Sequence, residues 1–385
     1  MNIVTSRRHR LAPQLSVVQV MRQAALLAVT GLSCGVIAEE SERLAEPAGA
    51  APEKPWLITP TVSSNPKLGT EVGVLAAYLK QLDAHSTPSM TGLSATYSDT
   101  DSSTLTLFSQ LYWGGDDHRL TLLAATAEVN NEYDDFLGSG QSAETRDSVH
   151  TLGFRYMRRL SVGGWFAGAQ AVSTNYVIGA DGALNGLLNQ IGLSGFDAIG
   201  IGLVLEHDAT NHQRDPSSGH RFTLHNFAYR ESLGGESSFD VGYAQMNWYT
   251  TSRALTSTRA PQAAVIGVQI KGRLTNDAPL SGYSSVSLPG YTVGNYLATR
   301  YSHVLVDGRI PLSGGFGVVA FAGVGCLYGH DIAQRSLSCG DAVYPSAGFG
   351  LSYMLKKEAS IVIRLELAKG KNDNEALYLR FGHSF

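Results

Sequence analysis

Few residues in this chain have the types and spacing that catalysis needs. Residues 31–35 read Gly-Leu-Ser-Cys-Gly, a Gly-x-Ser-x-Gly match, but Ser33 lies in a segment that we expect to be cleaved off. No His-Glu-x-x-His sequence occurs, and the 11 histidines are scattered. A serine paired with His303 across neighbouring strands is the remaining alternative, and any large sheet offers such coincidences. We therefore expect no enzyme activity and no cofactor.

Two cysteines remain after that cleavage, Cys326 and Cys339, separated by the sequence LYGHDIAQRSLS. In a compartment that permits disulfides such a pair is expected to bridge, with two unpaired thiols as the alternative. Together with His330 the pair offers too few ligands for a metal site. We expect a disulfide and no bound metal.

The first 38 residues have the pattern of a secretory signal peptide. Four arginines precede an apolar run that ends in the cleavage signature Val36-x-Ala38. The run is too short for the alternative, a transmembrane anchor. We expect residues 1–38 to be the signal peptide, residues 39–55 a periplasmic tether rich in Ala, Glu and Pro, and residues 56–385 the folded domain.

Loss of the signal would make the chain more acidic. The whole chain has 29 basic and 33 acidic residues, and the four charged residues of the signal are all arginines. The mature chain would therefore carry 25 basic and 33 acidic residues, a net charge of −8. A net acidic chain without a basic block argues against nucleic acid as a partner.

The mature chain divides into strand-like pieces in which apolar and polar residues alternate. In residues 359–368, Leu365 and Leu367 alternate with Arg364 and Glu366. A packed core would not tolerate these charges, whereas a polar or water-filled lumen does. No mature segment reaches 18 consecutive apolar residues, which excludes helical membrane spans. We count sixteen pieces, at 56–63, 70–80, 89–97, 103–113, 117–128, 147–157, 163–174, 196–207, 219–230, 236–249, 262–273, 296–310, 315–325, 344–354, 359–368 and 375–385.

The connectors between these pieces alternate in length from the middle of the chain onward. An even number of strands, with long loops at one end and tight turns at the other, is typical of an outer-membrane barrel. We predict an all-β, transmembrane antiparallel β-barrel of 16 strands in the bacterial outer membrane, in contact with lipid and lipopolysaccharide. A soluble all-β secreted protein is the alternative, and it would need a core of its own. With both termini periplasmic, the turn at 208–218 faces the periplasm, and the long connectors at 129–146, 175–195, 274–295 and 326–343 face the cell surface.

The last strand is expected to end the chain. A closed barrel has no edge, so we expect this strand to pair with the first strand over its whole length. Pro60 in the first strand removes a ladder donor and would weaken that pairing. The final Phe385 would lie at the periplasmic interface, and the barrel-assembly machinery would recognise the lipid face of the strand before folding. That face consists of Leu377, Leu379, Phe381, His383 and Phe385.

Several motifs follow one another in order through the second half of the chain. A turn that begins at Asp208 ends in Pro216-x-x-Gly219, and LPGYTVGNY follows from residue 288 in the connector after the eleventh strand. VLVDGRIPL, GVVAFAGVG and YPSAGFGLSYML come next. This series resembles the bacterial surface-antigen family of outer-membrane barrels, the BamA/TamA type, most clearly over residues 196–385. The resemblance implies a function in membrane protein assembly or translocation, and a connector that folds an Arg-Gly-aromatic tip into the lumen.

The chain departs from the family pattern at both ends of an ion pair that the resemblance implies. The tip arginine would fall at Pro289, so that Gly290 and Tyr291 remain without the cation. The family's Phe-x-Asp-x-Gly motif reads Phe-Ala-Gly-Val-Gly from Phe321 to Gly325, without the aspartate. Loss of both partners avoids a lone buried charge, which would cost several kcal/mol.

The acidic-x-Arg pattern of the family's twelfth strand persists as Asp307-x-Arg309. Two residues apart on a strand, both side chains face the same way, and we place them in the lumen. The pair is either a latch for the inserted connector or an ordinary lumenal ion pair.

Two classes of function remain. The resemblance favours assembly or translocation, in which the seam between the first and last strands opens. Family insertases normally carry soluble periplasmic modules before the barrel, whereas we expect only residues 39–55 there, so that any periplasmic partner would be a separate protein. The alternative is a passive pore or structural barrel, because sixteen strands can enclose an aqueous channel.

Overall fold

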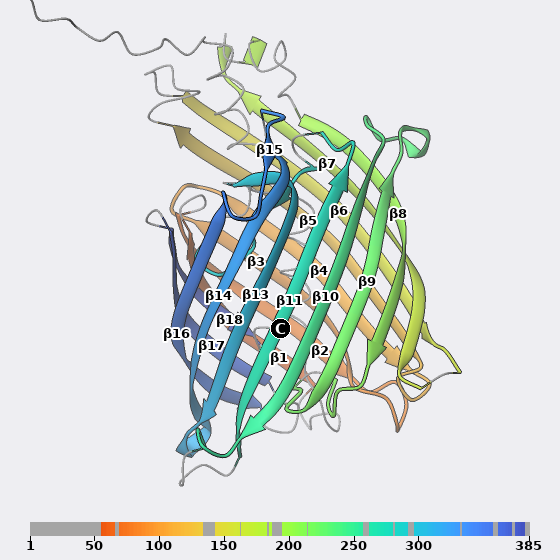
Figure 1. The fold of residues 1–385 in the computed structure, drawn as a ribbon, viewed down its shortest axis with the longest axis vertical. Coiled ribbons are helices and arrows are strands. Elements are labelled where there is room, and N and C mark those ends of the chain that lie inside the picture. The colour runs from red at the N-terminus through yellow and green to blue at the C-terminus, as the bar shows by residue number, and fades with distance from the viewer. Residues whose placement is uncertain are drawn as a thin grey trace, which may run out of the picture.

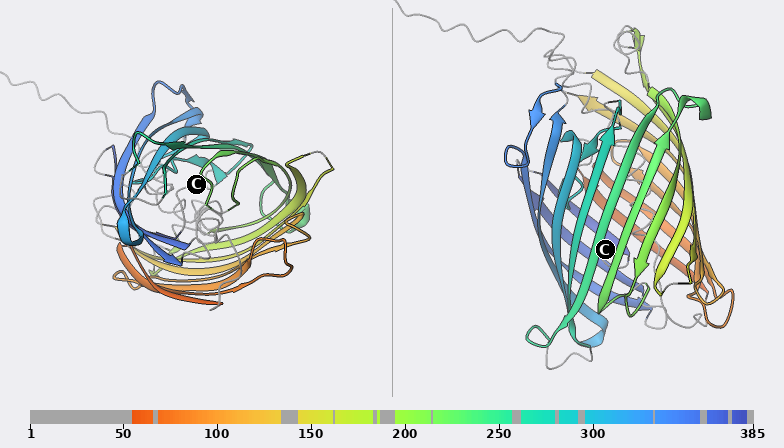
Figure 2. Two further views of the ribbon diagram at one scale, coloured as in Figure 1. Left: turned by 90° about the horizontal axis from the view of Figure 1, so that it is seen from below. Right: turned by 45° about the vertical axis from the view of Figure 1, so that its right-hand side comes forward.

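The protein forms the predicted all-β antiparallel barrel (Figures 1 and 2). Its computed structural model describes residues 55–65, 69–133, 143–161, 163–182, 185–186, 195–213, 215–256, 262–279, 282–291, 296–331, 333–356, 361–371 and 374–381. The expected signal peptide and most of the expected tether lie outside these residues. No helix among the described residues is long and apolar enough to cross a membrane.

Sixteen strands make the wall, and their positions agree closely with the alternating pieces of the sequence. They are β1 (Trp56–Asn65), β2 (Gly69–Lys80), β3 (Ser89–Ser98), β4 (Ser103–Trp113), β5 (His118–Tyr133), β6 (Ala143–Arg159), β7 (Trp165–Ala180), β8 (Gly195–Asp208), β9 (Gly219–Tyr229), β10 (Phe239–Ser252), β11 (Ala264–Asn276), β13 (Leu297–Pro311), β14 (Phe316–Asp331), β16 (Val343–Lys356), β17 (Ile361–Gly370) and β18 (Glu375–Phe381). The connectors hold two short strands, β12 (Ser284–Ser285) and β15 (Ser336–Leu337), and the 3-10 turns η3 (Glu231–Leu233) and η5 (Ser313–Gly315).

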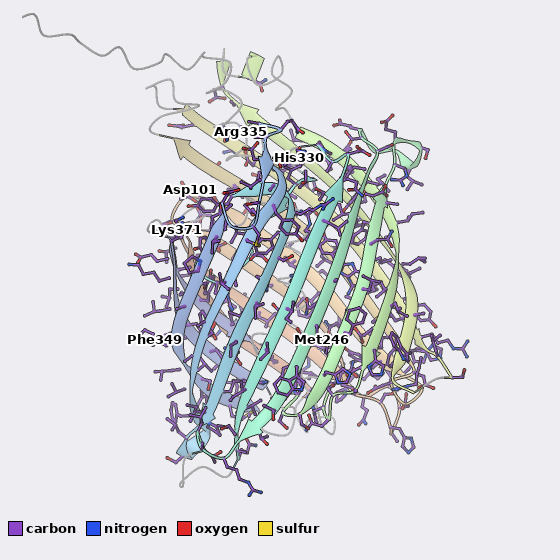
Figure 3. All side chains as sticks on the ribbon, in the orientation of Figure 1. Asp101, Met246, His330, Arg335, Phe349 and Lys371 are labelled. Atoms are coloured by element: carbon purple, nitrogen blue, oxygen red, sulfur yellow. A yellow bond between two sulfur atoms is a disulfide. The ribbon has the colours of Figure 1, made fainter. Side chains whose placement is uncertain are left out.

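Alternate side chains along each strand face lipid or lumen. On β17, Leu365 and Leu367 are 43% and 51% exposed on the outer face, whereas Arg364 and Glu366 are 0% exposed on the inner face. Phe349 on β16 is 63% exposed and points away from the wall (Figure 3). The outer face is therefore the apolar surface that contacts lipid, and the predicted lumenal charges lie inside.

Three of the predicted long connectors are shorter than expected, because their strands continue beyond the alternating pieces. The β5–β6 ladder extends to the pair Tyr133 and Ala143, β7 continues to Ala180 and β14 to Asp331. The alternation of the sequence reports only the part of a strand that lipid contacts. A hairpin ladder can continue above the membrane with polar residues on both faces. Antiparallel order puts these connectors at one end of the barrel and the turn after β8 at the other (Figure 1). That the first end faces the cell surface remains a prediction.

The ring closes through a short seam between β1 and β18. Only two residue pairs form it within the described residues, Ser63 with Tyr378 and Ser64 with Leu377. By contrast, β1 and β2 form ten pairs and β17 and β18 form seven. The expectation that the last strand pairs with the first over its whole length is therefore wrong for the described part of β18. Pro60 has no N–H to donate, and β18 meets only the end of β1 that lies beyond it.

The outer face gives a test of membrane embedding. Leu203 lies near the middle of β8 and is 70% exposed, while Val177 lies near the end of β7 and is 46% exposed. Leu203→Arg should lower the free energy of unfolding in lipid vesicles by about 2–4 kcal/mol, and Val177→Arg by about 0–1 kcal/mol, because the cost of a charge falls toward the interface. Urea titration of the refolded barrel measures both. Equal losses for the two variants would contradict the assigned membrane position.

Candidate functional site: a segment folded into the barrel lumen

The connector between β11 and β13 folds back into the barrel. Residues 282–291 of this connector contain side chains that are almost fully buried: Tyr283 and Tyr291 are 5% exposed, Leu288 is 1% and Val286 is 0% exposed. β12 pairs with the start of β13, Ser284 opposite Ala298, which turns the segment along the inner face of the wall. We call residues 282–291 the inserted segment. The apolar and aromatic side chains that it packs against come from β13, β14 and β17: Ala298, Tyr301, Leu305, Phe321, Leu327 and Ala368.

The tip of the inserted segment is Pro289-Gly290-Tyr291, and hydrogen bonds fix it to the wall. The Ser346 hydroxyl on β16 donates to the Pro289 carbonyl oxygen at 2.5 Å. The Gly290 amide donates to the Tyr378 hydroxyl on β18 at 3.1 Å. The tip therefore contacts the last strand at a residue that also forms the seam.

The hydroxyl of Tyr291 makes two further bonds. It donates to the Pro345 carbonyl oxygen at 2.6 Å and accepts from the Lys371 amide at 2.7 Å. The Tyr291 ring also lies edge-on to the rings of Tyr296 and Tyr344, with centroids 6.0 Å and 5.8 Å away. One side chain thus joins the inserted segment to β16 and to the β17–β18 turn.

Two glycines make room for the tip. Gly290 has φ +93°, a conformation that side chains with a Cβ rarely adopt, and a Cβ there would lie 3.1 Å from the Gly370 nitrogen. A Cβ on Gly370 would lie 2.5 Å from the Tyr291 ring. The Gly-aromatic pair that the sequence retains therefore fits a matching glycine on the wall.

Apolar packing occupies the place where the family resemblance implies an ion pair. A Cβ on Gly323 would lie 3.1 Å from the Leu288 side chain, and one on Gly325 would lie 2.8 Å from the Tyr301 hydroxyl oxygen. Phe321, 5% exposed, packs in the same cluster. Glycine at these positions of β14 lets Leu288 and Tyr301 approach the wall without a buried charge.

Asp307 and Arg309 face the lumen as predicted. Their described contacts, however, are with the β8–β9 turn and with β17 and not with the tip. The Arg309 Nε lies 3.3 Å from an Asp307 oxygen, and Arg309 also pairs with Asp215 at 3.4 Å and donates to the Pro216 carbonyl oxygen at 3.0 Å. Asp307 accepts from Arg364 on β17 at 3.1 Å. These contacts hold the β8–β9 turn in the lumen, and a latch function for the inserted segment stays a prediction.

The same ion network extends to the last strand. Arg364 pairs with Glu366 on its own strand, and Glu366 lies 3.3 Å from Arg380 on β18. Arg364 and Glu366 are both 0% exposed. The lumenal charges were evident from the alternation of β17, but their partners on β13 and β18 were not.

The β8–β9 turn contains the predicted residues Asp208, Pro216 and Gly219. The Asp208 carboxylate accepts from Arg119 at 3.1 Å and from Arg221 at 3.2 Å. Gly219 has φ +99°, and a Cβ there would lie 2.1 Å from a backbone oxygen. Asp208 therefore anchors the start of the turn, Gly219 permits its end, and the Pro216 carbonyl bonds to the lumenal wall.

Cys326 on β14 and Cys339 in the β14–β16 connector form a disulfide. It closes the hairpin that carries β15, where the amide and hydroxyl of Ser338 bond to the Asp341 carboxylate and lower the pKa of that group. Closure of a loop of this length stabilises the fold by about 3 kcal/mol on the chain-entropy model. No group of three or more His, Cys, Asp or Glu side chains that could hold a metal occurs in the described part of the chain.

The terminal strand keeps its predicted faces. Leu377 and Leu379 lie opposite the outward Leu367 and Leu365, and Phe381 lies opposite Ile363. His383 and Phe385 lie outside the described residues, so recognition through the final Phe stays a prediction. Sequence reasoning missed Tyr378 and Ser346 as partners of the tip, and no local pattern marks them.

The Tyr291 hydroxyl offers a direct test of the anchoring. Tyr291→Phe removes both bonds of that hydroxyl and should lower the free energy of unfolding by about 1–3 kcal/mol. In a Ser285→Cys background, the new thiol should also react faster with a maleimide, because the inserted segment leaves its site more often. Tyr353→Phe, on the 41% exposed outer face, is the matched control and should change neither readout. Equal labelling rates in the two variants would show that Tyr291 does not hold the segment.

Comparisons with known proteins support the architecture. No family model matches the sequence, and no curated protein sequence does. The structure of CdiB from Acinetobacter baumannii is similar over 84% of this chain and 59% of that chain, with 10% identity and a TM-score of 0.58. CdiB from Escherichia coli is similar over 90% of this chain and 69% of that chain, with 11% identity and a TM-score of 0.57. BamA from Haemophilus ducreyi lacking POTRA domains 1–3 has a TM-score of 0.49, with 13% identity over 86% of this chain and 70% of that chain. With its apolar outer face, the fold is that of a transmembrane β-barrel of the bacterial outer membrane.

Proposed function

We propose that the protein inserts or translocates other proteins at the outer membrane, and that the seam between β1 and β18 is where the barrel opens. The observation that carries the proposal is the position of the inserted tip beside a short seam. Tyr378 forms one of the two seam pairs with β1 and also accepts a hydrogen bond from Gly290 at the tip. Movement of the inserted segment and opening of the seam would therefore act on the same strand.

Within the described ladders, the energetics favour opening at this seam over opening at the other pairs of neighbouring wall strands. Each additional ladder pair contributes backbone hydrogen bonds that have no replacement in lipid. Among the described residues, the seam has two pairs and the β1–β2 hairpin has ten, so the seam leaves fewer such bonds to break. An incoming strand could replace them by pairing with the exposed edge of β18, which is how one sheet edge recruits another.

The proposed role is not enzymatic, and its partners are client polypeptides and a separate periplasmic protein. The fold similarity to the CdiB structures, at 10% and 11% identity, is compatible with this role. A passive pore is the second candidate. It is supported by polar lumenal side chains on β10 and β11 that stay partly exposed, among them Gln245 and Lys271.

A cross-link across the seam separates the two candidates. Ser64→Cys with Leu377→Cys places two cysteines opposite each other in the ladder, at the spacing that a disulfide needs. In proteoliposomes, oxidation of this variant should reduce insertion of an unfolded outer-membrane barrel protein, scored by its heat-modifiable mobility, at least tenfold, and reduction should restore it.

The matched control is Ile58→Cys with Ala76→Cys, a facing pair in the β1–β2 hairpin, which does not open in this proposal. Its cross-link should leave insertion unchanged. Full insertion activity with the seam locked would exclude the proposal, and ion conductance that persists in both locked variants without any insertion activity would favour a passive pore.

A further inference from the structure

The β8–β9 turn reaches a strand that is not its neighbour in the wall. β10 and β11 lie between β9 and β13 in the order of the sheet. The Arg309 guanidinium on β13 nevertheless pairs with Asp215 of the turn at 3.4 Å and donates to the Pro216 carbonyl oxygen at 3.0 Å. Its carbon also lies 5.6 Å from the centre of the Tyr249 ring on β10. The turn therefore crosses two strands on the inside of the barrel, and Arg309 holds its far side.

The turn has a fixed shape of its own. The Asn211 side-chain oxygen accepts from the amides of Ser217 and Ser218, both at 3.0 Å. Arg221, at the start of β9, donates to the Gln213 carbonyl oxygen at 2.8 Å. Because these bonds lie within the turn and its own strand, they do not depend on the contact with β13. Release from β13 would therefore move the turn as a unit.

From Arg309, charges of alternating sign continue along the lumen to the last strand. The Arg309 Nε lies 3.3 Å from an Asp307 oxygen, and Asp307 accepts from Arg364 on β17 at 3.1 Å. Arg364 pairs with Glu366, which lies 3.3 Å from Arg380 on β18. We call these residues, together with Asp215, the ion series. It connects the β8–β9 turn with β18 through contacts between side chains of opposite charge.

The last member of the ion series contacts a residue of the seam. The Arg380 guanidinium carbon lies 4.1 Å from the centre of the Tyr378 ring, and Tyr378 forms one of the two described pairs with β1. Glycine on β16 makes room for the series, because a Cβ on Gly350 would lie 2.9 Å from the Glu366 Cγ. The series therefore ends where the wall has its shortest described ladder.

Burial makes each inner member of the ion series depend on its neighbours. Asp307 is 1% exposed and Arg309 is 7% exposed. Arg364 and Glu366 are both 0% exposed. A buried charge that loses one partner is left poorly compensated in a medium of low dielectric constant, so the side chains beside it shift to restore the pairing. A change at one end of the series therefore alters the contacts at the other end.

We propose that the β8–β9 turn is a gate that Arg309 holds in place, and that the ion series couples the position of this gate to β18. The inference rests on the proposed function, in which the seam between β1 and β18 opens. A client polypeptide that displaces the turn separates Asp215 from Arg309, and the rearranged series then holds β18 less firmly. Such coupling is reciprocal, so a change at Arg380 must also loosen the turn.

Arg380→Gln tests the coupling from the end of the series that is farthest from the turn. In a Ser217→Cys background, the thiol in the turn should react with a maleimide about fivefold faster or more, which is the lower end of typical coupling between two sites. Arg230→Gln is the matched control, because it removes an arginine from an ion pair with Asp240 outside the series. Its labelling rate should equal that of the Ser217→Cys protein alone. Heat-modifiable mobility verifies that each variant is folded.

Asp215→Asn tests the coupling in the opposite direction. Its side chain is 29% exposed, so the change removes a charge from the surface of the turn and leaves the wall intact. In the Ser64→Cys, Leu377→Cys background, the seam disulfide should form more slowly, because a looser β18 keeps the two thiols apart for longer. Asp117→Asn, in an ion pair with Arg159 at the turn after β4, is the control and should leave the rate unchanged.

Equal maleimide rates in Arg380→Gln and Arg230→Gln, or equal seam oxidation in Asp215→Asn and Asp117→Asn, would overturn the proposal. Both measurements are made without a client polypeptide. Failure of the coupling is therefore a separate result from failure of client insertion, which the seam cross-link tests.

Discussion

The structure depends on how a barrel of sixteen strands fills its interior. A wall of this size encloses more space than its own inward side chains can occupy. In this protein the inserted segment packs into that space, and Tyr291 secures it by bonding to the Pro345 carbonyl oxygen and the Lys371 amide. Gly290 and Gly370 allow the contact because a Cβ on either residue would collide with the opposite chain. The anchor is thus a fit between an aromatic ring and a glycine, supported by hydrogen bonds.

This anchor differs in kind from the buried ion pair that the family resemblance implies. An ion pair in the lumen must recover the cost of removing two charges from water, whereas apolar packing of Leu288 against Gly323 carries no such cost. The charged side chains of the lumen lie nearer the β8–β9 turn. There Arg309 bonds to that turn, and Arg364 connects Asp307 with Glu366. Both arrangements reach β18, through Tyr378 and through Arg380, so the strand at the seam is also the strand on which the lumenal contacts converge.

The strands could be predicted well from the sequence, because a strand that crosses the membrane alternates apolar residues that face lipid with polar residues that face the lumen. The sequence identified Arg364 and Glu366 as lumenal for the same reason. The residue pairs of the seam could not be predicted from the sequence. Alternation shows which face of the sheet a residue lies on, but not its register with a strand from the other end of the chain. The partners of the tip were missed on similar grounds: Tyr378 and Ser346 become neighbours of residues 289–291 only when the barrel closes. The strand extensions were missed because above the membrane no face has to be apolar.

The most direct test of the account is whether the tip lies against β16 in the native barrel. The Ser346 hydroxyl donates to the Pro289 carbonyl oxygen at 2.5 Å, which makes the two residues neighbours, so a short thiol-to-thiol cross-linker should bridge Pro289→Cys and Ser346→Cys in the barrel assembled in its own envelope. Mass mapping of the non-reduced protein should find this bridge together with the Cys326–Cys339 bridge. If both introduced thiols stay free while Cys326–Cys339 forms, the inserted segment does not occupy the lumenal site, and the coupling of tip and seam fails with it.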